Sequence, residues 1–458
     1  MLPFNTRPEF KTTTLIFMVL LWFITGCSSD KDDPALVEPI IDAGPSIFAD
    51  DDANSDVMMQ AFWWDTYTDA NISQQGSLYA FISAKLVELS NANIDLLWMP
   101  PPSEGEGMGY HPRQLFDFNS NHGTETELKS LLTNMKNRKM HGMADLVFNH
   151  RIGTETWTDF TNPSWSCDAI CIDDEGYTNA DAFGTKPCGA IDEGLNWEGA
   201  RDLNHQNMEV RNGLKDYLDR LKNLGFDAWR YDFVKGFPAK YVGEYNSATP
   251  YYYSVGEYWD GNALAIKNWI DGTESTATDA TTKKSGAFDF DLKYKLKTAI
   301  VDHNYSVLRS ATDGAVGLSG ISGYGDASVT FLDNHDTGCI NRSDCDNLFS
   351  KSTGQITLGY VYILTHPGIP MVWAYHYFFQ DPTGDLKSAI NDIILLRKEL
   401  GINANSTVNV LEAVDGASGY YVAEIDNKLL VKIGRGAYTP PANWKLNTSG
   451  TEYSIWTL

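Results

Sequence analysis

The sequence is short of positive charge. It has 35 Lys and Arg residues against 60 Asp and Glu, so the 458-residue chain carries a formal net charge of −25 at pH 7. A surface with this excess repels the phosphates of nucleic acids and the head groups of anionic lipids, which argues against both as partners. A neutral ligand is indifferent to such a surface, whereas a divalent cation is attracted to it.

Long apolar runs are lacking as well. The run Leu15–Ile24 is too short to cross a bilayer as a stable helix, and it follows the basic residues Arg7 and Lys11, as in an export signal. It continues into ITGC, which resembles a bacterial lipobox. We therefore expect a lipoprotein signal over residues 1–27, a lipid anchor on Cys27, and export to the outer membrane or cell surface. An ordinary signal peptide with an unrelated cysteine is the alternative.

The segment 28–56, which follows this signal, has nine Asp or Glu residues against one Lys and is poor in aromatic residues. Such a composition cannot bury enough apolar surface to fold, and we expect a disordered tether.

Cysteine is scarce, with six in the whole chain. Its use fits an oxidising compartment, in which disulfides form and persist. Five cysteines follow Cys27, so one thiol stays unpaired within the chain. We expect Cys339 to pair with Cys345, and Cys171 with Cys188.

Apolar runs alternate with helix-length segments along most of the chain. This alternation is typical of βαβ units and a parallel sheet, and eight such runs predict an α/β fold of the (β/α)₈ TIM-barrel type over 57–150 and 206–400. The predicted strands are Val57–Phe62, Ile94–Met99, Gly142–Phe148, Phe226–Tyr231, Tyr251–Val255, Ala287–Phe290, Ser328–Leu332 and Pro370–Trp373.

Two regions depart from this alternation. Residues 151–205 are rich in Gly, Asp, Asn and Cys and show no helical pattern, and a connection of that length inside a compact domain indicates a functional insertion. Residues 401–458 change to short alternating strands with turns at Asp426-Asn427 and Gly434, which predicts a small antiparallel sheet.

Three acids follow predicted strands: Asp232 in DAWRYDFVKGF, Glu257 in YYYSVGEYW and Asp336 in VTFLDNHDT. Polar side chains at the carboxyl ends of parallel strands point into the shared mouth of a barrel. Three acids there repel one another and raise at least one pKa. A structural role for all three is hard to find, so catalysis is the favoured interpretation.

Those segments, with the earlier GMADLVFNHR, closely resemble the signature regions of the α-amylase family, glycoside hydrolase family 13. VMMQAFWWD, LLWMPPPSEGEGMGYHPRQLFDF, LTHPGIPMVW and GYYVAEIDNKLLVKIG resemble its plant-type branch, so the likeness extends from about Val57 to Leu458. The resemblance implies a barrel with a small B domain inserted after the third strand and a C-terminal sheet domain.

The resemblance also implies roles for the acids. Asp232 would be the nucleophile, Glu257 the general acid/base, and Asp336 a third acid that binds sugar hydroxyls in the transition state. Arg230 lies two positions before Asp232, on the same face of the strand, where a guanidinium keeps that carboxylate ionised. The residues expected to bind substrate are Tyr110, His150, Arg230, Lys235, His335 and Trp259; of these, Tyr110 and Lys235 have the strongest purely structural alternative.

Calcium is the cofactor that the resemblance implies. Hard cations take carboxylate and carbonyl oxygens, and Asn149, Asp202 and the Gly236 carbonyl match the main ligands of the family. Further candidate ligands are Asp173, Asp174 and Asp192, for which a solvated acidic loop is the alternative. We expect no chloride dependence, because Gly338 and Cys339 stand where chloride-binding relatives have a basic residue.

The leading hypothesis is a monomeric, endo-acting, retaining α-amylase that cleaves α-1,4-glucosidic bonds of starch, glycogen and maltooligosaccharides. Two alternatives remain open. An exo-acting maltooligosaccharide-forming amylase or a 4-α-glucanotransferase would keep the same site, and a surface starch-binding lipoprotein would have lost catalysis.

Overall fold

The structure is a computed structural model, and it describes residues 54–274, 285–338, 340 and 347–458. The predicted signal, most of the predicted tether and the predicted Cys339–Cys345 disulfide lie outside these ranges. Within the described ranges, the structure contains no helix that is both long and apolar enough to span a membrane.

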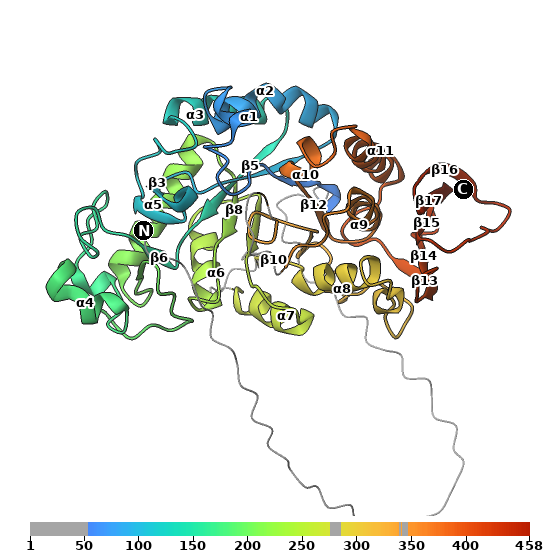
Figure 1. The fold of residues 1–458 in the computed structure, drawn as a ribbon. Helices are drawn as coiled ribbons and strands as arrows, with labels where there is room; N and C mark the ends of the chain where they lie inside the picture. Colours follow the sequence, from blue (N-terminus) through green and yellow to red (C-terminus); the bar gives the residue numbers. More distant parts are fainter. Residues whose placement is uncertain (1–53, 275–284, 339, 341–346) are drawn as a thin grey trace, which may run out of the picture. The chain divides into compact units, whose positions relative to one another are not determined.

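A closed barrel of parallel strands forms the centre of the described chain, which confirms the predicted barrel (Figure 1). Each strand pairs with its neighbours in chain order, and β1 closes the ring on the last strand, with Met58 opposite both Leu96 and Met371. All of the strand residues are buried except His141, which is half-buried, as expected for strands covered on both faces. The barrel strands are β1 (Met58–Gln60), β2 (Leu96–Met99), β5 (His141–Leu146), β8 (Ala228–Tyr231), β9 (Tyr253–Gly256), β10 (Gly286–Phe288), β11 (Ser328–Thr330) and β12 (Ile369–Trp373).

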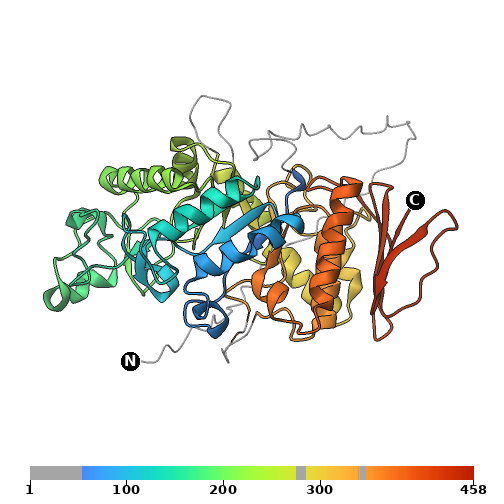
Figure 2. The same cartoon turned by 90° about the horizontal axis from the view of Figure 1, so that it is seen from above.

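Helices connect the barrel strands and surround them (Figures 1 and 2). Local signals set their ends: Thr124 and Glu127 form a capping box on α3, and Gly225 ends α5 in the left-handed conformation at φ 119°. These helices are α1 (Ala70–Ser73), α2 (Leu78–Asn91), α3 (Glu125–Lys136), α5 (Met208–Leu224), α6 (Ala239–Ala248), α7 (Ala263–Gly272), α8 (Phe290–Ile300), α9 (Thr353–Thr365), α10 (Ala374–Phe378) and α11 (Asp385–Leu400), with the 3₁₀ turn η4 (Tyr305–Leu308) after α8.

An insertion follows β5, the third barrel strand. It leaves as β6 (His150–Arg151) and returns as β7 (Arg201–Asp202), and these two short strands pair antiparallel. Between them lie the 3₁₀ turn η3 (Cys167–Ala169) and the helix α4 (Glu175–Phe183), although the sequence had shown no helical pattern there.

The predicted pairing of Cys171 with Cys188 is wrong. Cys188 pairs with Cys167, and Cys171 is a free, buried cysteine. Cys167 begins the turn η3, where its carbonyl accepts a hydrogen bond from the Cys188 backbone N–H at 2.9 Å. The Cys171 N–H instead bonds the Asp202 carbonyl at 3.0 Å, which ties that residue to β7.

The C-terminal residues form the predicted antiparallel sheet, in the order β13-β14-β15-β17-β16. It lies beside α9 in both views, and His366, directly after α9, bonds the Tyr421 hydroxyl through Nε2 at 3.0 Å (Figures 1 and 2). The strands are β13 (Val408–Val414), β14 (Tyr420–Ile425), β15 (Leu429–Gly434), β16 (Lys445–Gly450) and β17 (Tyr453–Thr457).

Candidate active site

Two of the three predicted catalytic acids stand directly after adjacent barrel strands. Asp232 follows β8 and Glu257 follows β9, and the last residues of these strands, Tyr231 and Gly256, are register partners. The Glu257 N–H also bonds the Tyr231 carbonyl at 2.9 Å, so the ladder continues into the acids. Both carboxylates therefore leave the barrel at the same level of its carboxyl edge, where a TIM barrel carries its active site.

Arg230 joins these two acids. Its guanidinium is fully buried, with Nη1 2.6 Å from Asp232 Oδ1 and Nη2 2.8 Å from Glu257 Oε1. The second pair is an ion contact without the alignment of a hydrogen bond. The Phe233 N–H reaches Glu257 Oε2 at 3.2 Å, and Phe233 holds a left-handed φ of 42°, a strained conformation for a bulky residue. One cation thus fixes both the predicted nucleophile and the predicted acid.

The surroundings of Glu257 favour its protonated form. Burial raises the pKa of Glu257 to about 8; Arg230 opposes this rise, and Asp232 and Asp336 add to it. A carboxyl group kept neutral near neutral pH can donate a proton to a leaving oxygen. This is the property that a general acid requires.

The raised pKa predicts the pH dependence of activity. Glu257 must be protonated to act as an acid, so kcat/KM is expected to fall as pH rises through about 8. Initial rates on a soluble maltooligosaccharide, measured across the pH range in which the protein stays folded, test this expectation. An activity that stays constant well above pH 8 would contradict it.

Asp336 lies in the turn after β11, and its neighbours hold it toward the same mouth. Trp64 donates from Nε1 to its Oδ1 at 3.2 Å, and His335 Nε2 lies 3.3 Å from its Oδ2. The amide of Gln60, in β1, accepts from the His335 N–H at 3.2 Å and therefore presents Nε2 to His335 Nδ1, at 2.8 Å. His335 Nδ1 is then the acceptor, which leaves the ring proton on Nε2, facing Asp336.

Tyr110 is stacked in this mouth. Its ring lies parallel to His335, at 5.0 Å between centroids and 8° between planes, and packs on Trp64 at 5.4 Å. Only 8% of Tyr110 is exposed. Tyr110, which the sequence predicts to bind substrate, therefore lies beside the predicted acids, and most of its surface is already covered.

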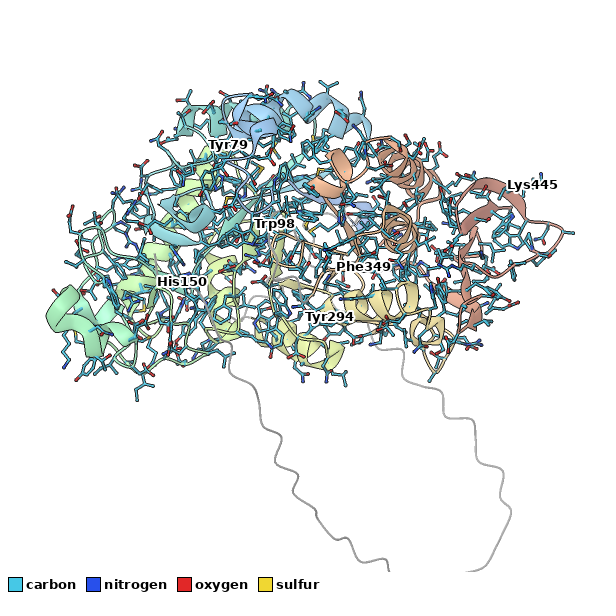
Figure 3. The ribbon with its side chains drawn as sticks, in the orientation of Figure 1. Tyr79, Trp98, His150, Tyr294, Phe349 and Lys445 are labelled. Atoms are coloured by element: carbon cyan, nitrogen blue, oxygen red, sulfur yellow. A yellow bond between two sulfur atoms is a disulfide. The ribbon has the colours of Figure 1, made fainter. Side chains whose placement is uncertain are left out.

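The remaining predicted substrate residues, His150, Lys235 and Trp259, each contact other protein side chains or main chain. His150 is buried, its Nε2 lies 2.8 Å from the Tyr110 carbonyl, and its ring stacks on Trp197 at 4.2 Å. Lys235 pairs with Asp260 at 2.9 Å, and Trp259 stacks on Phe290 at 4.8 Å. Figure 3 labels His150, in β6 of the insertion, and Trp98, which sits inside the barrel. Sugar contact by His150, Lys235 and Trp259 stays a prediction.

Asp145 is a member of this site that the sequence reasoning missed. It lies in β5, fully buried, and its Oδ1 accepts from Arg230 Nη1 at 2.8 Å. Its Oδ2 accepts from the Tyr110 hydroxyl at 2.6 Å and from Trp98 Nε1 at 3.0 Å. An aspartate inside an otherwise apolar strand, in GMADLVFNH, was the available signal.

Part of the predicted calcium set is assembled between the insertion and the barrel. Asp202 is buried and accepts from Asn149 Nδ2 at 3.1 Å. A Cβ added at Gly236 would collide with the Asn149 amide oxygen, and one at Gly194 would collide with the Gly236 carbonyl. The Asn149 amide oxygen therefore lies close to Gly236, and the loop that contains Asp192 packs on the Gly236 carbonyl through Gly194.

The electrostatics of this cluster fit a cation. Burial, with the charges of Asp174 and Asp192, raises the pKa of Asp202 to about 8, and Asp192 Oδ2 is buried without a hydrogen-bond partner among the described residues. Asp174 differs, since its two oxygens bond Arg201 and the Asp202 N–H, and Asp173 is exposed. The described chain holds no group of three or more acidic, His or Cys side chains placed for a metal. The set that fits is Asn149, Asp192, Asp202 and the Gly236 carbonyl.

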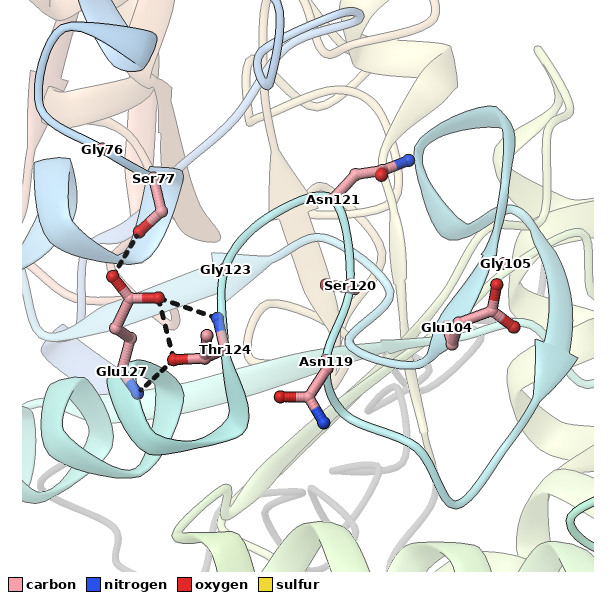
Figure 4. Close-up of a pocket in the computed structure, with 10 residues that line it drawn as sticks. All are labelled: Gly76, Ser77, Glu104, Gly105, Asn119, Ser120, Asn121, Gly123, Thr124 and Glu127. Carbon is pink, nitrogen blue, oxygen red and sulfur yellow. Dashed lines mark hydrogen bonds between the residues drawn. The ribbon is translucent and has the colours of Figure 1, made fainter.

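A separate surface pocket of about 540 Å³ lies between the β3–β4 hairpin and the first turns of α2 and α3 (Figure 4). The hairpin consists of β3 (Glu104–Glu106), the turn η2 (Gly107–Gly109) and β4 (His111–Gln114). Polar groups that line the pocket are hydrogen-bonded to one another, since Glu127 accepts from Ser77 and from Thr124. None of the predicted site residues lines it.

The sequence matches two family descriptions. "Alpha amylase, catalytic domain" matches residues 48–168, and "Alpha-amylase C-terminal beta-sheet domain" matches residues 399–457. "Probable alpha-amylase 2" of Arabidopsis thaliana is 33% identical over 418 residues, which cover 88% of this chain and 94% of the relative. The chain therefore belongs to the α-amylase family and is a glycoside hydrolase.

Other similarities are more distant. "Glucan 1,4-alpha-maltotetraohydrolase" of Stutzerimonas stutzeri is 25% identical over 391 residues, which cover 79% of this chain and 65% of the relative. Among solved structures, the α-amylase of Geobacillus thermoleovorans complexed with acarbose superposes with a TM-score of 0.62 at 18% identity, over 88% of this chain and 98% of that one. At that identity the structural likeness shows the fold alone.

Proposed function

We propose that the protein is an endo-acting, retaining α-amylase that hydrolyses internal α-1,4-glucosidic bonds of starch, glycogen and maltooligosaccharides. The observation that carries this proposal is the Arg230 guanidinium in contact with both Asp232 and Glu257. A retaining glycosidase requires a carboxylate nucleophile and a carboxylic acid close together, and the two groups here share one buried cation at the barrel mouth.

In the first step, Asp232 attacks the anomeric carbon while Glu257 donates its proton to the glycosidic oxygen, so the carbon–oxygen bond breaks and a glycosyl ester forms on Asp232. In the second step, Glu257 takes a proton from a water molecule, and the water oxygen attacks the anomeric carbon. The bond between that carbon and Asp232 breaks, which releases the sugar and restores the Asp232 carboxylate. Arg230 holds the Asp232 carboxylate in place through the 2.6 Å contact from Nη1, and the hydrogen bonds that sugar hydroxyls donate to Asp336 strengthen as positive charge develops on the ring.

A timed product profile on amylose tests the proposal. Endo action releases a ladder of oligosaccharides early, together with a rapid loss of iodine staining. A single short product from the start would support exo action, an alternative that the likeness to the maltotetraohydrolase favours. Longer chains made from a maltooligosaccharide would indicate transfer, and binding without any release of reducing sugar would indicate a non-catalytic protein.

We propose that calcium binds Asn149, Asp192, Asp202 and the Gly236 carbonyl and joins the insertion to the barrel. When bound, the ion would neutralise the Asp192 and Asp202 carboxylates. Removal of the ion by a chelator is expected to lower the unfolding temperature, because a ligand at 100 times its Kd stabilises the fold by about 2.7 kcal/mol. Asp202→Asn should abolish the response to calcium in differential scanning calorimetry, and the exposed Asp173→Asn is the control. An unfolding temperature that does not depend on calcium would refute the site.

We also propose that the protein is an exported bacterial lipoprotein with a lipid on Cys27. The support is the sequence ITGC after the apolar run Leu15–Ile24. Labelled fatty acid should join the wild-type protein during expression in a bacterium and should not join Cys27→Ser. Absence of label from the wild-type protein would overturn the proposal.

A further inference from the structure

Asp145 stands opposite Arg230 in the barrel wall. The two residues are register partners on the neighbouring parallel strands β5 and β8, so their side chains point to the same face and meet at 2.8 Å. No solvent reaches Asp145, and its hydrogen-bond donors are Arg230, Tyr110 and Trp98. Its role has no counterpart among the steps described above, since it faces the protein rather than the bond to be cleaved.

Asp145 connects Arg230, which contacts two of the predicted acids, with Tyr110, which lies beside the third. Through Oδ1 it holds the guanidinium that lies on Asp232 and Glu257. Through Oδ2 it holds the Tyr110 hydroxyl, and the Tyr110 ring is stacked on His335 next to the third acid. Trp98 Nε1 donates to the same oxygen at 3.0 Å.

We propose that Asp145 is a positioning residue of the hydrolysis. It holds the Arg230 guanidinium against the carboxylates of Asp232 and Glu257, and it holds the Tyr110 ring against His335. It also shares the charge of Arg230, so that the guanidinium does not hold Glu257 in its ionised form. This inference rests on the proposed function and adds to it a residue that does not touch substrate.

The charges around the site give the direction of the effect. The charged and titratable groups that face Asp145 are Arg230, Asp232, Tyr110 and Tyr217. Those that face Glu257 are Arg230, Asp232 and Asp336. Arg230 is the one cation in each set. Burial raises the pKa of Asp145 to about 7, so this carboxyl group is ionised on the alkaline side of the pH profile. If that charge is removed, the attraction of Arg230 for the ionised form of Glu257 is less compensated, and the pKa of Glu257 falls.

The test compares Asp145→Asn with the wild-type full chain. The variant keeps the size and an acceptor oxygen but loses the charge. We expect kcat on a maltooligosaccharide to fall by about 10²-fold, the cost of a small displacement of catalytic groups, with KM changed far less. We also expect the alkaline limb of the kcat/KM profile to move to lower pH. Asp145→Glu restores the charge on a side chain that is one methylene longer. The alkaline limb of its kcat/KM profile should therefore return toward the wild-type pH, while kcat stays low.

The matched control is Asp289→Asn, which removes another fully buried carboxylate near the end of a barrel strand. Asp289 accepts from the Leu292 N–H and from Ser328 Oγ, and no described contact joins it to Arg230. It should lower stability and leave kcat and the alkaline limb unchanged.

The proposal is overturned if folded Asp145→Asn keeps the wild-type kcat and the wild-type alkaline limb of the kcat/KM profile. It is also overturned if this variant, like the control, loses stability alone. If Asp145→Asn does not fold, a wild-type kcat in Asp145→Glu would overturn it. If the wild-type chain cleaves no glucan, both the proposed function and this inference fail. If the wild-type chain is active and the Asp145 variants match it, only this inference fails.

Discussion

Replacing Glu257 by glutamine is expected to lower kcat on starch by about 10²–10⁴-fold, the usual contribution of a general acid. Glutamine keeps the size of the side chain and can still lie beside Arg230 Nη2, but it cannot donate a proton to the leaving oxygen. Binding to insoluble starch should remain near the wild-type level. Initial rates and depletion binding, measured on the same preparations, check both expectations.

The control for this variant is Glu244→Gln. Glu244 lies in α6 and pairs with Arg211 at 2.9 Å and Lys215 at 2.6 Å, both of which belong to α5. It should leave kcat unchanged. A Glu257→Gln enzyme with wild-type turnover would remove Glu257 from the acid role.

Replacing Asp232 by asparagine is expected to cost more, on the order of 10⁴-fold or more in kcat, because the covalent intermediate can no longer form. An aryl maltoside with a very good leaving group separates the two acids. Such a substrate needs no protonation, so Glu257→Gln should release a burst of phenol and accumulate the glycosyl-enzyme, whereas Asp232→Asn should release none.

The stereochemistry of the product gives an independent check on Asp232. Retention, seen as α-maltose in early NMR spectra, is required if Asp232 forms an ester. An initial β product would show that water attacks directly, and the nucleophile role would then be wrong even if the variant is inactive.

The barrel could be predicted from the sequence because its strands are buried on both faces and appear as continuous apolar runs, such as Leu96–Met99. The contact between Arg230 and Asp232 could also be anticipated, since alternate residues of one strand share a face. These are local regularities, and they need no knowledge of which strands are neighbours.

The role of Asp145 could not be predicted in this way, although an aspartate inside an apolar strand marks the residue as unusual. Its importance depends on the register that places it opposite Arg230, 85 positions along the chain, and on the Tyr110 hydroxyl that arrives from another loop. The disulfide failed for a similar reason. Cys167 and Cys171 lie four positions apart in one loop, and only the path of that loop decides which of them meets Cys188.

The contact between Gly194 and Gly236 has a consequence for how this enzyme can change. Main chain presses on main chain there, with no room for even a methyl group on either residue. A larger residue at Gly194 would force the insertion off the loop that begins with Asp232, and a larger residue at Gly236 would collide with the Asn149 side chain. Gly194 and Gly236 are therefore fixed points of the contact between the insertion and the barrel, and this contact sets no such limit on residues elsewhere in the insertion.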